Sequence, residues 1–259
     1  MKKVLWIFLI LSCILTSCIK DLLCIKGNGI TETEMRPVTA FVNIENSTPF
    51  DLIYHKADTT SLLIKAEGNI LQHIITETFN NTLELRTTPL SACFDYSERP
   101  VIIATSPDLS KIFLSGSGDI IADEMEGTVV TLKLSGSGSI SVSQLTGTKL
   151  SIALSGSGDI IADDAICNEA EMDISGSGNI SVKGTGNIGL IRISGSGNIY
   201  SADFTLHSLS AAISGSGSIF TTVVNTLSAI ISGSGNIYLR GDPEITQIIS
   251  GAGRIIKYR

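Results

Sequence analysis

The phrase Ser-Gly-Ser-Gly-Asp-Ile at residues 115–120 decides the fold of this chain, because it returns at a nearly constant interval. Copies begin at Ser115, Ser135, Ser155, Ser175, Ser194, Ser214, Ser232 and Ser250, and the last copy reads Ser-Gly-Ala-Gly. The intervals between them are 20, 20, 20, 19, 20, 18 and 18 residues. A nearly fixed period indicates one structural unit that repeats and packs on its neighbours.

Apolar residues flank every copy and form columns when the copies are aligned. The residue before the phrase is Leu or Ile throughout, and the sixth residue of the phrase is always Ile. Alternating apolar residues predict strands, and identical residues at the repeat period predict parallel strands stacked in register. The fold is therefore predicted to be all-β, a parallel β-helix with coils of about 20 residues.

Strict alternation also assigns the residues of the phrase to opposite faces. Between Leu134 and Ile140, both inward, it points Gly136 and Gly138 inward and leaves the serines outside. Glycine leaves room where a coil narrows or turns. The next residue is Asp, Asn, Ser or Arg, and the first three form turns by bonding nearby backbone. Polar stretches such as 123–127 are expected to supply the second bend of each coil.

The position after the Ile column is predicted to point outward and to form a second column. It reads Ile121, Ser141, Ile161, Ser181, Tyr200, Phe220, Tyr238 and Ile256. An exposed run of large apolar side chains usually marks a contact surface. Ile161, Tyr200, Phe220, Tyr238 and Ile256 are the candidate contact residues. The alternative is that the N-terminal segment or a loop covers them within the monomer.

Residues 1–17 are predicted to be a lipoprotein signal peptide. Two lysines precede an apolar run over 4–15 that is too short to span a bilayer. Leu-Thr-Ser before Cys18 resembles the bacterial lipidation motif, so Cys18 is expected to carry a membrane anchor and residues 18–26 to form a tether. An ordinary signal peptide is the alternative, and Cys13 is a weaker competing site. The expected location is the bacterial cell envelope at the outer membrane, and the sequence does not decide between its periplasmic side and its surface side.

Three further cysteines, Cys24, Cys93 and Cys167, follow the proposed anchor. An odd number indicates no disulfide framework, and no spacing indicates zinc. A Cys24–Cys93 pair stays open as an alternative in an oxidising compartment.

Residues 27–259 are expected to form one domain, with regular coils over 111–259. Residues 27–110 lack the repeat but carry β-rich runs, which predicts irregular opening coils or a cap. Asn-Asn at 80–81 indicates a turn. The Ile and Thr content of 69–79 favours a strand over a helix.

Charge and motifs exclude several functions. With 18 basic and 25 acidic residues, a net charge of −7 and no basic cluster, the chain is not expected to bind nucleic acid. Asp119 and Asp159 lie two coils apart, about 10 Å by strand spacing, which suits an inverting carboxylate pair. Turn formation explains both residues equally. Calcium β-rolls need a nine-residue period, so no metal or cofactor is expected.

Several short motifs in order resemble a known bacterial family. They are Gly-Asn-Gly-Ile at 27–30, Glu-Met-Arg-Pro-Val at 34–38 with Phe41, Ile-Lys-Ala-Glu-Gly-Asn-Ile-Leu at 64–71, Ile-Thr-Glu-Thr at 75–78, Asn-Thr-Leu-Glu-Leu at 81–85, and the repeats. The chain thereby resembles, over about residues 27–259, the family described as putative auto-transporter adhesin, head GIN domain. The resemblance implies a right-handed parallel β-helix, related in shape to pectin-lyase-like folds, on a secreted or lipid-anchored protein that functions in adhesion. It brings no catalytic residues.

The predicted function is that of a non-enzymatic cell-envelope lipoprotein. Its rigid strand face would present a surface to a glycan or a protein. Two alternatives stay open: a carbohydrate-active enzyme of β-helix type, and a structural component that forms homo-oligomers through the aromatic column.

Overall fold

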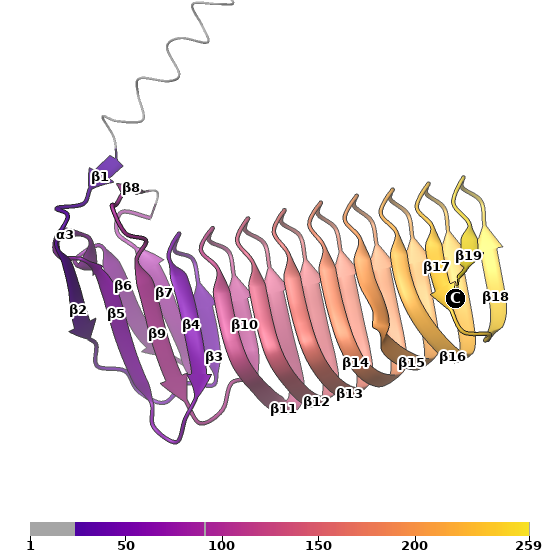
Figure 1. The fold of residues 1–259 in the computed structure, drawn as a ribbon, viewed down its shortest axis with the longest axis horizontal. Coiled ribbons are helices and arrows are strands. Elements are labelled where there is room, and N and C mark those ends of the chain that lie inside the picture. The colour runs from indigo at the N-terminus through magenta and orange to yellow at the C-terminus, as the bar shows by residue number, and fades with distance from the viewer. Residues whose placement is uncertain (1–23, 91, 259) are drawn as a thin grey trace, which may run out of the picture.

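One ladder of parallel strands runs through most of the molecule (Figure 1). The computed structural model describes residues 24–90 and 92–258. The strands of the regular coils are β10 (Lys111–Leu114), β11 (Ile120–Leu134), β12 (Ile140–Leu154), β13 (Ile160–Ile174), β14 (Ile180–Ile193), β15 (Ile199–Ile213), β16 (Ile219–Ile231), β17 (Ile237–Arg240), β18 (Glu244–Ile249) and β19 (Ile255–Lys257). Each coil pairs in parallel with the next, which confirms the predicted parallel β-solenoid.

The Ile column predicted from the repeat is in register from coil to coil. Ile120 pairs with Ile140, and equivalent pairs continue to Ile255. Every member except Ile255 is fully buried. Full burial of one such side chain stabilises the folded state by about 1.5–3 kcal/mol. The column is therefore a main component of the core.

The second bend of the regular coils does not interrupt the strand. β11, β12 and β13 each continue for 15 residues. The ladder between β11 and β12 skips only the positions of Asp123 and Thr128. The polar stretch 123–127 was expected from the sequence to supply this bend. The strand continues because the backbone groups on both sides of the bend keep their partners in the neighbouring coil.

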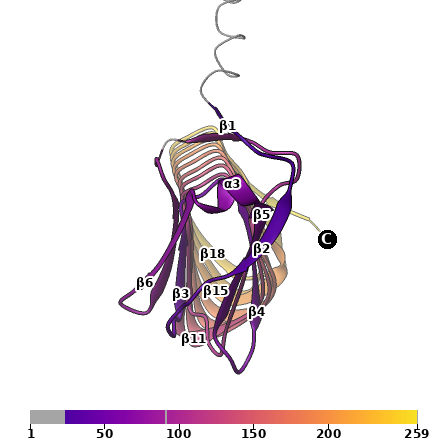
Figure 2. The same ribbon diagram turned by 90° about the vertical axis from the view of Figure 1, so that its left-hand side faces the viewer.

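A cap with antiparallel strands covers the N-terminal end of the solenoid (Figure 2). Its strands are β2 (Thr31–Met35), β3 (Asn43–Asn46), β4 (Asp51–Lys56), β5 (Ser61–Glu67), β6 (Ile74–Phe79), β7 (Thr82–Thr87) and β9 (Val101–Ser106). β5 pairs antiparallel with β2 and β9, whereas β3 and β4 pair in parallel with β10 and β11. Such a cap keeps the edge of the first coil from pairing with other chains.

Two local features of the cap were assigned from sequence, one correctly. Asn80 and Asn81 have φ of 47° and 58° and form the turn of the antiparallel β6–β7 hairpin, as predicted. The strand expected over 69–79 begins only at Ile74, because the short helix α3 (Gly68–Leu71) precedes it. A helical turn buries the consecutive side chains Ile70 and Leu71 together, which alternation along a strand cannot do.

The segment from Cys24 to Ile30, called here the N-terminal latch, is fastened across the cap. Strand β1 (Cys24–Lys26), in the region expected to be tether, pairs with β8 (Cys93–Asp95). A disulfide joins Cys24 to Cys93, with Cα atoms 4.4 Å apart. The pairing that the sequence left open is therefore present.

Glu67 anchors the rest of the latch from within the cap. Its carboxylate accepts hydrogen bonds from the backbone N–H of Gly29 (2.7 Å) and of Ser97 (2.6 Å). Asn69 donates to the Lys26 carbonyl at 2.7 Å. The motifs at 27–30 and 64–71, separated in sequence, thus contact each other. Although Glu67 is only 1% exposed, the two donated backbone bonds hold its pKa below the usual value.

Replacing Glu67 with Gln is expected to lower the melting temperature at neutral pH. One amide N–H₂ group would then face a backbone N–H, and one of the two hydrogen bonds would be lost. Because the folded state lowers the pKa of Glu67, its stabilising contribution is present above the unfolded value near 4.5 and disappears as the pH falls through the folded value. The difference between wild type and Glu67→Gln should therefore shrink in acid. Calorimetry from about pH 7 to pH 3 tests this, with the exposed Glu244→Gln as control. A difference that does not change with pH would contradict it.

Candidate ligand-binding surface

The predicted outward column lies in register along one face of the solenoid. Ser181 pairs with Tyr200, Tyr200 with Phe220, and Phe220 with Tyr238, which pairs with Ile256. The Tyr200 and Phe220 ring centroids are 5.1 Å apart with planes 20° apart, and those of Phe220 and Tyr238 are 4.5 Å apart and 5° from parallel. Stacked rings contribute about 0.5–1.5 kcal/mol per pair beyond their burial. The rings therefore also hold the last coils together.

The column is partly accessible within the described part of the chain. Tyr200 is 43% exposed and Ile256 is also exposed, whereas Ile161, Phe220 and Tyr238 are half-buried. No described segment covers Tyr200. The alternative that the N-terminal segment or a loop covers the column therefore does not hold for this residue. Ile161 lies further along the same column, separated from Tyr200 by the coil of Ser181.

The column also continues into the cap, which the sequence did not reveal. Ile121 pairs with Ile53, and Ile53 pairs with Ile103. The alternation in Leu-Ile-Tyr at 52–54 was a usable signal. Without the Ser-Gly-Ser-Gly phrase, the register of this strand relative to Ile121 could not be assigned.

Glycine is required in the repeat by the close approach of neighbouring coils. A Cβ atom built on Gly136 would overlap the carbonyl oxygen of Gly116, and one on Gly138 would overlap that of Gly118. Alternation indicated that these glycines point inward. Glycine is also required because the carbonyl oxygen of the preceding coil fills the space that a side chain would need. The serines of the phrase are exposed, as predicted.

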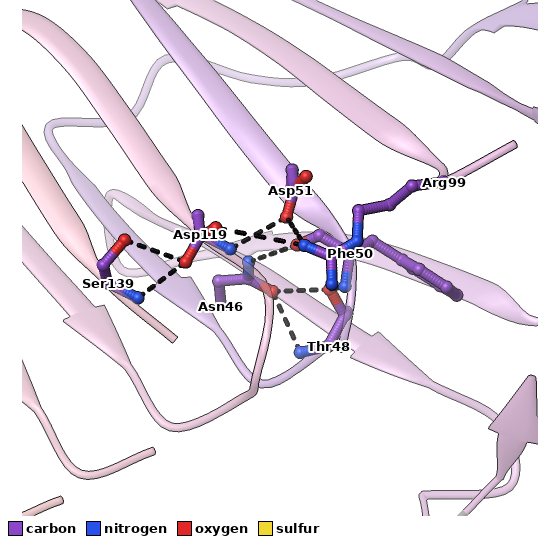
Figure 3. Close-up of polar contacts among 7 residues, drawn as sticks. All are labelled: Asn46, Thr48, Phe50, Asp51, Arg99, Asp119 and Ser139. Atoms are coloured by element: carbon purple, nitrogen blue, oxygen red, sulfur yellow. Dashed lines mark hydrogen bonds and ion pairs between the residues drawn. The ribbon is translucent and has the colours of Figure 1, made fainter. Parts of the chain in front are cut away.

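The residue after each Ser-Gly-Ser-Gly joins one coil to the next. Figure 3 shows Asp119 between Asp51 and Ser139: the N–H of Asp119 donates to Asp51 Oδ1 at 3.0 Å, and Ser139 donates its N–H and its hydroxyl to Asp119 Oδ1, both at 2.8 Å. Later steps in which a side chain accepts the next backbone N–H are Asp159–Asn179, Asn179–Asn198, Asn198–Ser218, Ser218–Asn236 and Asn236–Arg254. Bonds to nearby backbone within the turn were expected. Each side-chain oxygen instead accepts a hydrogen bond from the backbone N–H of the equivalent residue in the next coil.

This arrangement engages one oxygen of each carboxylate considered as an enzymatic pair. Oδ1 of Asp119 accepts both bonds from Ser139, and Oδ1 of Asp159 accepts the N–H and the amide of Asn179 at 2.8 and 3.0 Å. Arg99 lies 2.8 Å from Asp51 and 3.9 Å from Asp119 (Figure 3). Both candidates are members of a structural ladder.

Residues 46–51 form an additional first turn that the sequence did not identify. Asn46 pairs with Leu114 and Leu52 with Ile120, which aligns Asn-Ser-Thr-Pro-Phe-Asp with Leu-Ser-Gly-Ser-Gly-Asp. Thr48 and Phe50 occupy glycine positions. Phe50 packs edge-on against Phe94, with ring centroids 5.0 Å apart. Thr48 and Phe50 can carry side chains because no Ser-Gly-Ser-Gly turn is stacked before this one. Cap residues such as Phe94 lie there instead.

Asn46 fastens this first turn through hydrogen bonds of its own (Figure 3). Its Oδ1 accepts the N–H and the hydroxyl of Thr48 at 2.9 and 2.7 Å, and its amide donates to the Phe50 carbonyl at 3.2 Å. Asn46 and Thr48 are both fully buried. Their polar groups are therefore paired without solvent.

The face formed by the strands before each turn carries a groove of about 410 Å³. Its floor includes the small residues Ala153 and Ala212, and Ile230 lies at one end. Arg192 is paired there with Asp173 and Glu171. The contacts of Glu171 with Arg192 and with Lys149 lower the pKa of Glu171.

Other candidate chemistry is absent from residues 24–90 and 92–258. No group of three metal-ligating side chains occurs there, and no helix there is long and apolar enough to cross a membrane. Cys167 is unpaired, and burial raises its pKa to about 11, so the reactive thiolate is rare at neutral pH. Cys18 and residues 1–17 lie outside the described residues.

The fold and the column define a capped parallel β-solenoid with a row of apolar side chains on one outer face. The family model for putative auto-transporter adhesin, head GIN domain, matches residues 40–243, and the chain belongs to this family, as its motifs predicted. Membership indicates a cell-surface or envelope protein.

Solved structures support the same fold. A Parabacteroides distasonis structure described as a putative lipid binding protein is 28% identical, covers 91% of this chain and 99% of its own, and has a TM-score of 0.84. Putative adhesins from Parabacteroides merdae and P. distasonis are 22% and 23% identical, cover 91% and 90% of this chain and 99% of their own, and both have TM-scores of 0.85. No curated protein matches the chain. These relatives are named as adhesins or as a lipid-binding protein rather than as enzymes.

Proposed function

We propose that this protein is a non-enzymatic adhesin of the bacterial envelope that binds its ligand on the column Ile161, Tyr200, Phe220, Tyr238 and Ile256. The run of three stacked rings, with Tyr200 exposed and Phe220 and Tyr238 half-buried, supports this function on a chain of an adhesin family. Large apolar groups exposed together are the usual feature of a contact surface.

The solenoid supports this function by holding the column rigid. Tyr200, Phe220 and Tyr238 stand on strands whose ladders run on both sides of each ring. Binding to a preorganised surface avoids much of the entropic cost of ordering it. A glycan or a protein is the expected ligand class.

We further propose that a lipid on Cys18 holds the mature chain at the outer membrane. The family is consistent with an envelope location. Labelling cells with a radioactive fatty acid tests the anchor: the protein should take up label, and Cys18→Ala should not. Label on Cys18→Ala, or none on wild type, would refute this anchor.

Absence of catalysis is part of the proposal, because Asp119 and Asp159 are engaged in the inter-coil ladder. Purified protein should therefore leave uronic-acid polysaccharides intact. Depolymerisation that Asp119→Asn or Asp159→Asn abolishes would instead establish the enzymatic alternative.

Replacing Tyr200, Phe220 and Tyr238 together with Ser is expected to lower ligand binding at least about tenfold. An array of glycans, matrix proteins and lipid vesicles identifies the ligand, and titration compares the variants. The matched control replaces Ile230 and Ile248, exposed on the strands before the turns, with Ser. Circular dichroism checks that each variant stays folded.

The outcomes separate the alternatives. Binding that survives the triple substitution would contradict the column as the ligand surface. Loss of vesicle binding only in the Ile230 and Ile248 variant would favour a lipid ligand in the groove that Ile230 lines. One P. distasonis relative is named a lipid binding protein. Light scattering that shows oligomers in wild type and monomers in the triple variant, without ligand binding, would favour self-assembly.

A further inference from the structure

We propose that the ring face of Tyr200 that looks toward Ser181 is a binding subsite for one pyranose unit of a glycan. This inference names the ligand class of the column and rests on the function proposed above. It depends on an uncovered ring face that occurs at one coil boundary of the column, between Ser181 and Tyr200.

The stack of rings ends at Tyr200 with one face uncovered. Phe220 covers the other face of Tyr200, at 5.1 Å between centroids. On the open side the in-register neighbour is Ser181, whose side chain is a single hydroxymethyl group. At the opposite end of the stack, Ile256 is the neighbour of Tyr238. Tyr200 therefore has the one ring face in the stack that is opposed by a small residue.

A bulge in β15 opens the surface beside this face. Ser181 pairs with Tyr200 but Gly184 pairs with Phe204, so β15 has one extra residue against β14. The next ladder is shifted in the same place, between Ser201 and Thr205. Bulges redirect side chains and recur beside functional sites.

The bulge is held in place by hydrogen bonds from the following coils. Thr222 donates its hydroxyl to the Ala202 carbonyl at 2.6 Å, and Arg240 donates to the same carbonyl at 3.3 Å. The redirected residue, Asp203, is exposed. The carboxylate therefore extends from a fixed backbone.

The resulting hollow has a volume of about 240 Å³ and combines an aromatic wall with a charged rim. It is lined by Ser181, Lys183, Tyr200, Ala202, Asp203 and Phe220. The Lys183 ammonium, which lies 2.7 Å from Asp163, supplies donors. The Asp203 carboxylate supplies acceptors.

A pyranose matches this combination. The C–H groups on one face of the sugar ring form a flat apolar surface that packs against an aromatic face. Its hydroxyls, which donate and accept, project from the edge of the ring toward groups such as Asp203 and Lys183. An organic cation would also pack on Tyr200, but the rim charges balance: Lys183 is paired with Asp163, and Arg240 lies 3.5 Å from Asp203. The rim therefore gives a cation no net attraction, whereas sugar hydroxyls can use both its donors and its acceptors.

Saturation-transfer NMR on the purified protein tests the subsite, with methyl β-glucoside, methyl β-galactoside, methyl α-mannoside and methyl N-acetyl-β-glucosaminide as probes. We expect at least one probe to bind, with a Kd on the order of 1 mM and with the saturated protons on one face of the sugar. Ser181→Phe extends the ring stack over the open face and should weaken binding at least about tenfold. Ser141→Phe, at the equivalent position two coils earlier, should change it less than about twofold.

A second pair of variants removes a ring instead of adding one. Tyr200→Leu should weaken binding as Ser181→Phe does, whereas Tyr238→Leu should not. Failure of every probe to bind, equal binding by Ser181→Phe and Ser141→Phe, or competition by tetramethylammonium would overturn the sugar subsite. The proposed adhesin surface would survive that result if the triple Ser variant still lost its array ligand.

Discussion

Replacing Gly158 with Ala should destabilise the solenoid by about 3–5 kcal/mol. A Cβ atom on Gly158 would overlap the carbonyl oxygen of Gly138 in the preceding coil. A carbonyl oxygen within a ladder cannot rotate away as the end of a flexible side chain can. The two coils must therefore separate at this turn.

Separation breaks the hydrogen bonding between the turns of these two coils. Across this interface, Ser157 donates its N–H to the Gly136 carbonyl at 3.2 Å. In a repeat protein, stability is approximately a sum over units and the interfaces between neighbours. Weakening one interface should thus allow the two sides to unfold separately.

Denaturant titration followed by circular dichroism measures this effect. The matched control is Gly127→Ala at the second bend of a coil, where the nearest atom to the new Cβ is Ser110 Cβ at 3.3 Å. We expect the control to cost less than about 1 kcal/mol and to keep a single transition. Equal losses in both variants would show that the turn glycines are not required by stacking.

Replacing Cys24 and Cys93 together with Ser should cost about 4 kcal/mol. The disulfide joins residues 69 positions apart, and a crosslink across so long a loop removes much entropy from the unfolded chain. The loss should fall on the cap, because β1 and β8 pair only with each other. The regular coils should remain folded.

Calorimetry with and without reductant checks this prediction. Reduced wild type should melt like the double Ser variant, whereas Cys167→Ser should retain its sensitivity to reductant, because Cys167 is not part of the disulfide. A double Ser variant that melts like oxidised wild type would contradict the stabilising role of the latch.

The periodic part of the fold could be predicted because each coil repeats the same local pattern. The in-register pairing of Ile120 with Ile140, and of Tyr200 with Phe220, follows from the interval between copies. The cap could not be derived in this way. The hydrogen bonds that Glu67 accepts from Gly29 and Ser97 join segments 30 or more residues apart that have no common pattern.

The candidate surface was predictable as a column but not in its detail. Alternation placed Tyr200 and Phe220 outward. The bulge that exposes Asp203 depends on how β15 meets both neighbours, and nothing in its own alternation indicates the extra residues. The inter-coil role of Asp119 was missed because a local turn explained the same residue type.

The junctions between coils also bear on how such a gene evolves. Loss of residues 135–154 would join Leu134 to Ser155, so that the junction again reads Leu-Ser-Gly-Ser-Gly. Recombination between repeats that share this phrase would therefore lengthen or shorten the protein in whole coils, each about 4.8 Å thick, while both ends stay unchanged. Homologous loci in related strains are expected to differ by whole coils more often than by single residues within these turns.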